Sequence, residues 1–205
     1  MRFSRLAATA FALLVTLATL AAQQAPAGGG QRGAGAQQPP APPMRLQSNG
    51  FIDGGLIPLK FTQAGAQVSP ALAWFNAPPT TQSFVLHMHD MEGARNRTSE
   101  DQLHWLVWNI PATTTALPEN VPMGDLKDGS HQTSASGNGT YRGPGAPATG
   151  TYPHYVFEIF ARDTKIDVPA NPTDPFDTRA KVLAAIQGHV VGKAVYLGLF
   201  RRPAE

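Results

Sequence analysis

The chain contains no cysteine among its 205 residues. This absence excludes disulfide bonds, thiolate chemistry and a lipid-modified cysteine anchor. The chain is long enough for one ordinary domain with a real apolar core. That core must therefore stabilise the fold without covalent crosslinks.

An excess of charge of one sign is also missing once the start of the chain is set aside. The formal net charge is +2, from 16 basic and 14 acidic residues. Without Arg2 and Arg5, 14 basic residues balance the 14 acidic ones. The mature protein therefore has no electrostatic signal for nucleic acid or for an anionic membrane surface as a partner.

Motifs of the common enzyme classes are absent as well. The sequence has no G-x-S-x-G nucleophile turn, no phosphate-binding loop of the G-x-x-x-x-G-K-[ST] type and no G-x-G-x-x-G fingerprint. No arrangement of nucleophile and base stands out. The sequence therefore predicts no enzyme of these classes, and no cofactor is expected.

The N-terminal segment is typical of an exported protein. A short basic start precedes the uncharged, Ala- and Leu-rich run 6–22, which predicts a signal peptide over 1–22. An uncleaved anchor is the alternative, but the run is near the lower limit for spanning a bilayer. Residues 23–43, rich in Gln, Ala, Gly and Pro, predict a disordered linker, and 44–205 the domain. We expect secretion, to the periplasm, with no integral membrane segment after cleavage.

Strand-like patterns dominate the rest of the chain. One helix is expected at 177–189, and the Gly- and Ser-rich stretch 112–150 has little apolar patterning. The sum is a mainly β domain with one helix. The expected strands are 44–48, a short strand after a turn within 54–61, 69–74, 83–90, 103–110, 152–163 and 194–201.

Runs 83–90 and 103–110 bring together three of the six histidines. Strict alternation places Asp90 on one face of the first run and both His87 and His89 on the other. In the second run, alternation places His104 opposite Trp105. Both faces of this run are largely apolar, so we expect it to be buried on both sides.

Five segments in order resemble one known family, the phosphatidylethanolamine-binding proteins, in the bacterial Raf-kinase-inhibitor-like (YbhB/YbcL-type) branch. The resemblance covers about 49–201 and implies two packed antiparallel sheets with Greek-key connections and one or two short peripheral helices. The segments are SPALAW at 69–74, DMEGA at 90–94, HWLVWNIP at 104–111, YRGPGAP at 141–147, and YVF at 155–157 followed by ARD at 161–163.

The resemblance also implies a pocket for phosphate or a phospholipid head group. By position its residues would be Asp90, His104, Tyr141, Gly143 and Tyr155, with Pro144 in the same loop and His154 a candidate for the family's second pocket histidine. An ungapped match puts Pro153 at that position and points His154 away, unless a one-residue bulge turns it back. The expected partner is a small anionic or phosphate-bearing ligand, and an inhibited partner protein is a further expectation.

The chemistry of such a pocket assigns roles to these residues. His104 would donate to the anion, Asp90 would orient the imidazole and raise its pKa, and Gly143 and Gly145 would offer backbone N–H groups. The alternative is that His104 is a core histidine satisfied by Asp90 alone.

A metal site is a second hypothesis for the same stretch. His87 and His89 are two apart on a strand and can share an ion, and with His104 and Glu92 they would form a metal-dependent enzyme site. Against this hypothesis, Asp90 points to the opposite face from both histidines.

Overall fold

A computed structural model describes residues 41–137 and 139–204. The predicted signal peptide over 1–22 and nearly all of the predicted linker lie outside these residues. Within them no helix has the length and apolar character needed to cross a membrane.

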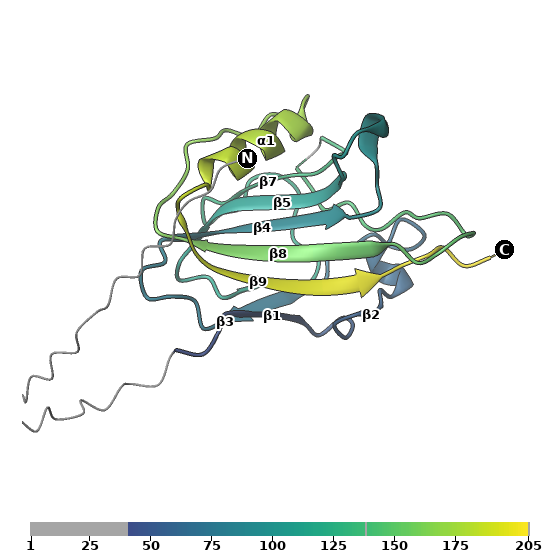
Figure 1. The fold of residues 1–205 in the computed structure, drawn as a ribbon, viewed down its shortest axis with the longest axis horizontal. Coiled ribbons are helices and arrows are strands. Elements are labelled where there is room, and N and C mark those ends of the chain that lie inside the picture. Colours follow the sequence, from purple (N-terminus) through teal and green to yellow (C-terminus); the bar gives the residue numbers. More distant parts are fainter. Residues whose placement is uncertain (1–40, 138, 205) are drawn as a thin grey trace, which may run out of the picture. The chain divides into compact units, whose positions relative to one another are not determined.

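The domain consists of two β-sheets and a single longer helix, as the sequence predicted (Figure 1). A three-stranded sheet has the order β1-β3-β6, and a six-stranded sheet has the order β2-β9-β8-β4-β5-β7. All pairings are antiparallel except β2 with β9, which is parallel. The strands are β1 Arg45–Ser48, β2 Gly55–Leu56, β3 Leu72–Phe75, β4 Ser83–Asp90, β5 Gln102–Pro111, β6 Ala116–Leu117, β7 His131–Thr133, β8 His154–Arg162 and β9 Val190–Leu199.

Helix α1 spans Pro175–Ala185 and so begins and ends earlier than the pattern predicted. Asp174 caps it by accepting a hydrogen bond from the backbone N–H of Asp177, at 2.9 Å, and proline occupies the first turn. Both features favour a helix start. Two short 3-10 turns, η1 Leu59–Phe61 and η2 Arg95–Arg97, complete the described elements.

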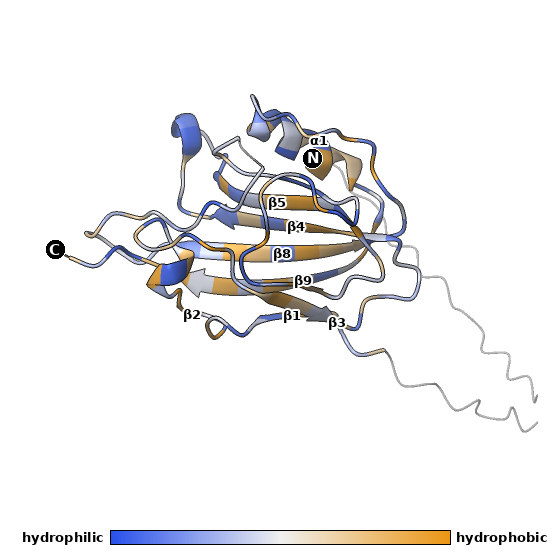
Figure 2. Ribbon diagram, turned by 180° about the vertical axis from the view of Figure 1, so that it is seen from behind, coloured by the Kyte–Doolittle hydropathy of each residue, from blue (hydrophilic) through white to orange (hydrophobic). Residues whose placement is uncertain are grey.

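The six-stranded sheet is covered on both faces. On its inner face, Met88, Trp105 and Phe157 pack against the three-stranded sheet in the larger core. On its outer face, Leu103 and Trp108 pack beneath α1 in a second core, which also contains Val85, Leu106, Ile166, Val182 and Ile186. In Figure 2, which views the ribbon from behind, much of β4, β5 and β8 has the colour of apolar residues. Residues 103–108 of β5 are all buried, and the expectation of burial on both faces is confirmed.

Strand β5 carries two bulges that break its alternation. The ladder pairs Met88 with Trp105 and His89 with Leu103, so His104 is an extra residue without a partner on β4. An extra residue of this kind shifts the alternation of side chains by one position, so two consecutive side chains lie on the same face of the sheet. His104 therefore lies on the same side as Trp105, and the prediction that the two point apart is wrong.

Asn109 forms the second bulge with a left-handed backbone, at φ 57°. Its side chain donates to the carbonyl of Ile166 at 2.8 Å and accepts from the N–H of Ile166 at 3.0 Å. Asparagine is among the few residues that tolerate this backbone conformation. The side chain thus ties β5 to the segment that leads into α1.

Replacing Asn109 should measure this tie. Asn109→Ala is expected to lower the free energy of unfolding by about 2 kcal/mol more than Asn120→Ala, since two hydrogen bonds of about 1 kcal/mol each are lost. Asn120 is an exposed residue with a similar φ of 61°, so it controls for the backbone cost alone. Chemical denaturation compares the two variants. Equal losses would mean that the bonds to Ile166 contribute nothing.

Candidate functional site

The bulge at His104 is fixed by a reciprocal pair of hydrogen bonds. The backbone N–H of Arg142 donates to the carbonyl of His104 at 3.0 Å, and Nδ1 of His104 donates to the carbonyl of Arg142 at 2.8 Å. Because a carbonyl only accepts, Nδ1 carries the proton and Nε2 of the neutral ring has a free lone pair. The imidazole is thus oriented by Arg142, and the expectation that Asp90 orients it is wrong.

A cavity of about 330 Å³ opens beside this pair. Asp90 lies at the end of β4, directly opposite Tyr155 of β8 in the ladder, and both line the cavity with His104. The rings of His104 and Tyr155 meet edge to face with centroids 5.1 Å apart. The full lining is Gln63, Asp90, Gln102, His104, Arg142, Gly145, Ala146, Pro147 and Tyr155.

Burial sets the charge of these groups. It lowers the pKa of His104 to about 4, and the Arg142 guanidinium acts in the same direction, so the ring is neutral at pH 7. The prediction of an imidazolium favoured by Asp90 is therefore wrong for the free protein. Burial also raises the pKa of Asp90, and it raises the pKa of Tyr155 to about 12 with help from the Asp90 carboxylate.

Arg142 is the one basic side chain of the lining that is charged at neutral pH. Its guanidinium makes no ion pair with any residue in the described part of the chain. The sequence hypothesis included the loop around Arg142 for its glycines and tyrosine and passed over the arginine itself. Arg142 lies between Tyr141 and Gly143, two residues that the sequence did single out, and this position could have identified it as a site residue.

Three other predicted site residues support the loop and do not line the cavity. The Tyr141 hydroxyl donates to the carbonyl of Phe61 at 2.8 Å. The carbonyls of Gly143 and Pro144 accept from the side chain and the backbone of Gln63, at 2.7 and 2.9 Å. Tyr141, Gly143 and Pro144 thus fasten residues 141–147 to the segment 61–63, and the walls of the cavity come from their neighbours.

His154 also lies outside the lining. The β4–β8 and β8–β9 ladders run without a shift at this end of β8, so no bulge turns His154 inward. Its Nδ1 contacts Glu92 Oε1 at 2.5 Å, and both side chains are nearly half exposed. The structure therefore offers one pocket imidazole, His104, where the resemblance implied two.

The predicted metal set does not converge. His87 and His89 point to the outer face of the six-stranded sheet, whereas His104 points to the inner one, and Glu92 pairs with His154. A site built on His87, His89 and His104 is therefore wrong.

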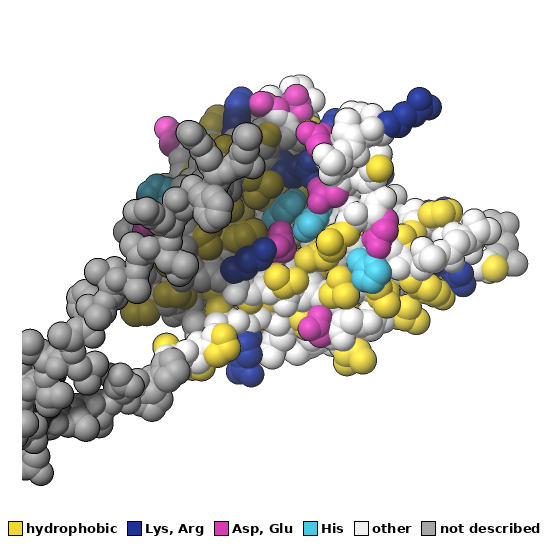
Figure 3. Space-filling view, viewed as in Figure 1, with side chains coloured by type: hydrophobic (Ala, Val, Ile, Leu, Met, Phe, Trp, Pro, Cys, Tyr) yellow, Lys and Arg dark blue, Asp and Glu magenta, His cyan; other side chains and the backbone are white. Residues whose placement is uncertain are grey.

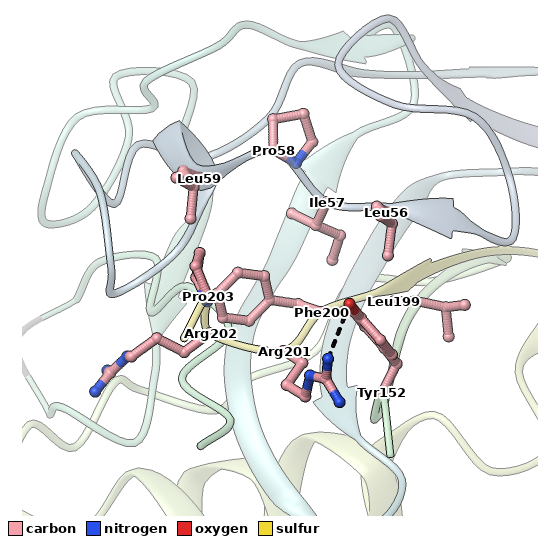
Figure 4. A pocket seen from close by; sticks show the side chains of 10 residues that line it. All are labelled: Leu56, Ile57, Pro58, Leu59, Tyr152, Leu199, Phe200, Arg201, Arg202 and Pro203. Atoms are coloured by element: carbon pink, nitrogen blue, oxygen red, sulfur yellow. Dashed lines mark hydrogen bonds between the residues drawn. The ribbon is translucent and has the colours of Figure 1, made fainter. Parts of the chain in front are cut away.

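A second hollow, of about 440 Å³, contains none of the predicted site residues. It lies between the segment around β2 and the end of β9, and its lining is mostly apolar (Figure 4). Arg201 contacts the hydroxyl of Tyr152 at 3.5 Å within it. The lining of this hollow contains no acidic side chain and no histidine. It therefore has fewer kinds of polar group that could bind a ligand than the cavity at His104.

Comparison with known proteins agrees with this fold. The chain is 38% identical over 161 residues to a UPF0098 protein of Methanothermobacter thermautotrophicus, covering 78% of this chain and 99% of that one. It is 29% identical to LppC of Mycobacterium tuberculosis, a candidate lipoprotein by name, over 79% of this chain and 74% of that one.

Among solved structures, YbcL of E. coli, described as a new member of the mammalian PEBP family, superposes with a TM-score of 0.66 at 24% identity. The match covers 78% of this chain and 99% of that one. The family model for phosphatidylethanolamine-binding proteins matches residues 47–201, which is nearly the whole described domain. The chain therefore belongs to the phosphatidylethanolamine-binding protein family.

Proposed function

We propose that the protein is an exported binding protein that holds a small phosphate-bearing ligand in the cavity at His104. The proposal rests on one observation: Arg142, the neutral His104 and Asp90, from separate segments, line one hollow, and Arg142 makes no ion pair among the described residues. The lining has no serine, cysteine or lysine among the described residues, which favours binding over covalent catalysis. The apolar N-terminal run and the lipoprotein name of a relative support export.

The groups of the cavity suit a phosphate monoester. Arg142 can form charge-assisted hydrogen bonds to phosphate oxygens. Nε2 of neutral His104 has a lone pair and accepts the proton of a protonated phosphate oxygen. A fully ionised phosphate instead requires the ring to take up a proton, so binding and proton uptake are coupled.

Asp90 adds a requirement to the ligand. A carboxylate repels phosphate, unless it is protonated or faces a positive or hydroxyl group of the same ligand. A zwitterion such as phosphoethanolamine satisfies both ends of the cavity, with its ammonium at Asp90 and its phosphate at Arg142. We therefore propose a ligand that carries both charges.

Arg142→Ala is expected to weaken phosphoethanolamine binding by tenfold or more, since a hydrogen bond to a charged group contributes about 1.5–3 kcal/mol. Isothermal titration measures the affinity, and Arg45→Ala is the matched control. Arg45 is an exposed arginine of β1 that stacks on Phe75 and does not line the cavity. His104→Ala should also weaken binding. Wild-type affinity in both Arg142→Ala and His104→Ala would contradict the proposal.

Asp90→Asn tests the zwitterion. The wild type is expected to prefer phosphoethanolamine to inorganic phosphate, because only the former offers a cation to Asp90. In the variant, the ratio of the affinity for phosphoethanolamine to the affinity for phosphate should fall about tenfold, because phosphate binds more tightly and phosphoethanolamine less tightly. An unchanged ratio of the two affinities would exclude Asp90 as the group that selects the ligand.

A further inference from the structure

Three side chains with metal-ligand chemistry meet on the outer face of the six-stranded sheet, the face opposite the cavity. His87 and His89 come from β4, and Glu158 comes from β8, directly opposite His87 in the ladder. We refer to these three residues as the outer-face cluster. Figure 3 shows histidine side chains in a hollow near the middle of this face, with acidic and basic side chains around them.

The distances within the cluster do not suit hydrogen bonds. Oε2 of Glu158 lies 3.6 Å from Nδ1 of His87 and 3.4 Å from Nε2 of His89. Good hydrogen bonds between nitrogen and oxygen are shorter, at about 2.7–3.2 Å. The three side chains nonetheless offer one ligand atom each within 4.8 Å of one another.

The same distances suit two ligands of one metal ion. Zinc bonds to nitrogen and carboxylate oxygen are about 2.0–2.1 Å, so two ligands of a tetrahedral zinc lie about 3.3 Å apart. Two of the three separations in the cluster are close to this value. The imidazoles are stacked, with centroids 4.4 Å apart and planes within 3°, so sharing one ion requires a ring to turn until both in-plane lone pairs meet at it.

A supporting layer of charged residues fixes the cluster. Nδ1 of His89 is bonded to Oδ2 of Asp101, and Asp101 is held by Arg179 of α1 at 2.5 Å. A histidine that donates one ring nitrogen to a carboxylate presents the other to a metal, which is the usual arrangement behind zinc ligands. Lys193 holds the other oxygen of Glu158 at 2.5 Å and leaves Oε2 available.

The imidazoles also have unmet bonding capacity. Nε2 of His89, the atom that faces Glu158, is buried and has no hydrogen-bond partner in the described part of the chain. Nδ1 of His87, which is only 4% exposed, has only the long 3.6 Å contact with Glu158. Burying a polar group without a good partner is costly, so the two nitrogen atoms that face Glu158 call for a ligand.

We infer that the outer-face cluster binds one divalent transition-metal ion of the zinc type, through Nδ1 of His87, Nε2 of His89 and Oε2 of Glu158. Water completes the coordination from the partly open side, where Glu158 and His89 retain some exposure. Asp101 acts as a positioning residue through His89. The inference does not depend on the proposed ligand, because the cavity lies on the other face of the sheet.

The test is a zinc titration of the full chain, without an affinity tag and stripped with a chelator. It is run at pH 8, where protons compete less for imidazole nitrogens. One Zn²⁺ per chain is expected by titration and by elemental analysis. Co²⁺ in its place should give the visible absorption of a tetrahedral site. Glu158→Gln and His89→Ala should each weaken zinc binding by 100-fold or more, and Asp101→Asn by about 10- to 100-fold.

Two controls make the result specific. His189→Ala removes an exposed histidine that is likewise paired with a carboxylate, Asp163 at 2.9 Å, and should bind zinc as the wild type does. Arg142→Ala should also retain zinc binding, which separates this site from the cavity. The inference is overturned if the wild type binds less than one equivalent, or if Glu158→Gln and His89→Ala bind as tightly as His189→Ala. Circular dichroism of each variant verifies that it is folded.

Discussion

Acidification from pH 7 to pH 4 is expected to remove about 3 kcal/mol of stability through His104 alone. The pKa of this histidine is lowered from 6.5 to about 4 by burial, so the unfolded chain binds a proton in this range while the folded protein does not. Protons therefore favour the unfolded state as the pH falls. The contribution is fully present above pH 6.5 and is lost progressively down to pH 4.

The variant His104→Asn isolates this effect from other titrating groups. Its amide nitrogen can donate to the Arg142 carbonyl in place of Nδ1, and it does not titrate. Chemical denaturation of both proteins at several pH values gives the difference in unfolding free energy between them. This difference should shrink by about 3 kcal/mol from pH 7 to pH 4. A constant difference would show that His104 is not held neutral by its surroundings.

Gly143→Ala should cost about 3 kcal/mol, at the upper end of what overpacking usually costs. A Cβ at this position would lie 2.4 Å from the carbonyl oxygen of Phe61 and 2.8 Å from Cα of Thr62. Both are backbone atoms, which cannot rotate away as a flexible side chain could. We expect the variant to push residues 141–147 off the segment 61–63 and to weaken ligand binding along with stability.

Gly150→Ala is the matched control for this prediction. Gly150 has a φ of +91°, but no atom lies within 4 Å of the place where a Cβ would be. The control therefore carries the backbone cost of about 1 kcal/mol without a collision. Thermal or chemical unfolding compares the two variants. If Gly143→Ala were no worse than Gly150→Ala, the contact with Phe61 would have to be looser than the structure shows.

Long strands with an uninterrupted apolar pattern were predictable from the sequence. The bounds of β4 match the prediction residue for residue, and β5 differs by one residue at each end. Strands β6 and β7 were missed, since they have two and three residues within a Gly- and Ser-rich stretch. Segments this short are strands because of their partners β3 and β5, and a local pattern does not report on partners.

The geometry of the site was harder to predict for a related reason. Alternation predicts a face only while the ladder is regular, so the bulge at His104 reversed the predicted face. The resemblance named Asp90, His104 and Tyr155, which do meet around one cavity, but it missed Arg142. The spacing of His87 and His89 correctly indicated a shared face, but Glu158 joins them only through the pairing of β4 with β8.

Because His104 has no partner residue on β4, its codon could be deleted without shifting the pairing of the two strands. Leu103 and Trp105 already lie on opposite faces, so losing the single codon between them would leave an ordinary pleat with every core contact of both neighbours intact. The product would fold and would still score as a relative of its parent, yet it would have no imidazole at the cavity. In homologous genes, a one-residue gap at this place in an alignment therefore identifies copies that keep the scaffold and lack the imidazole of the cavity.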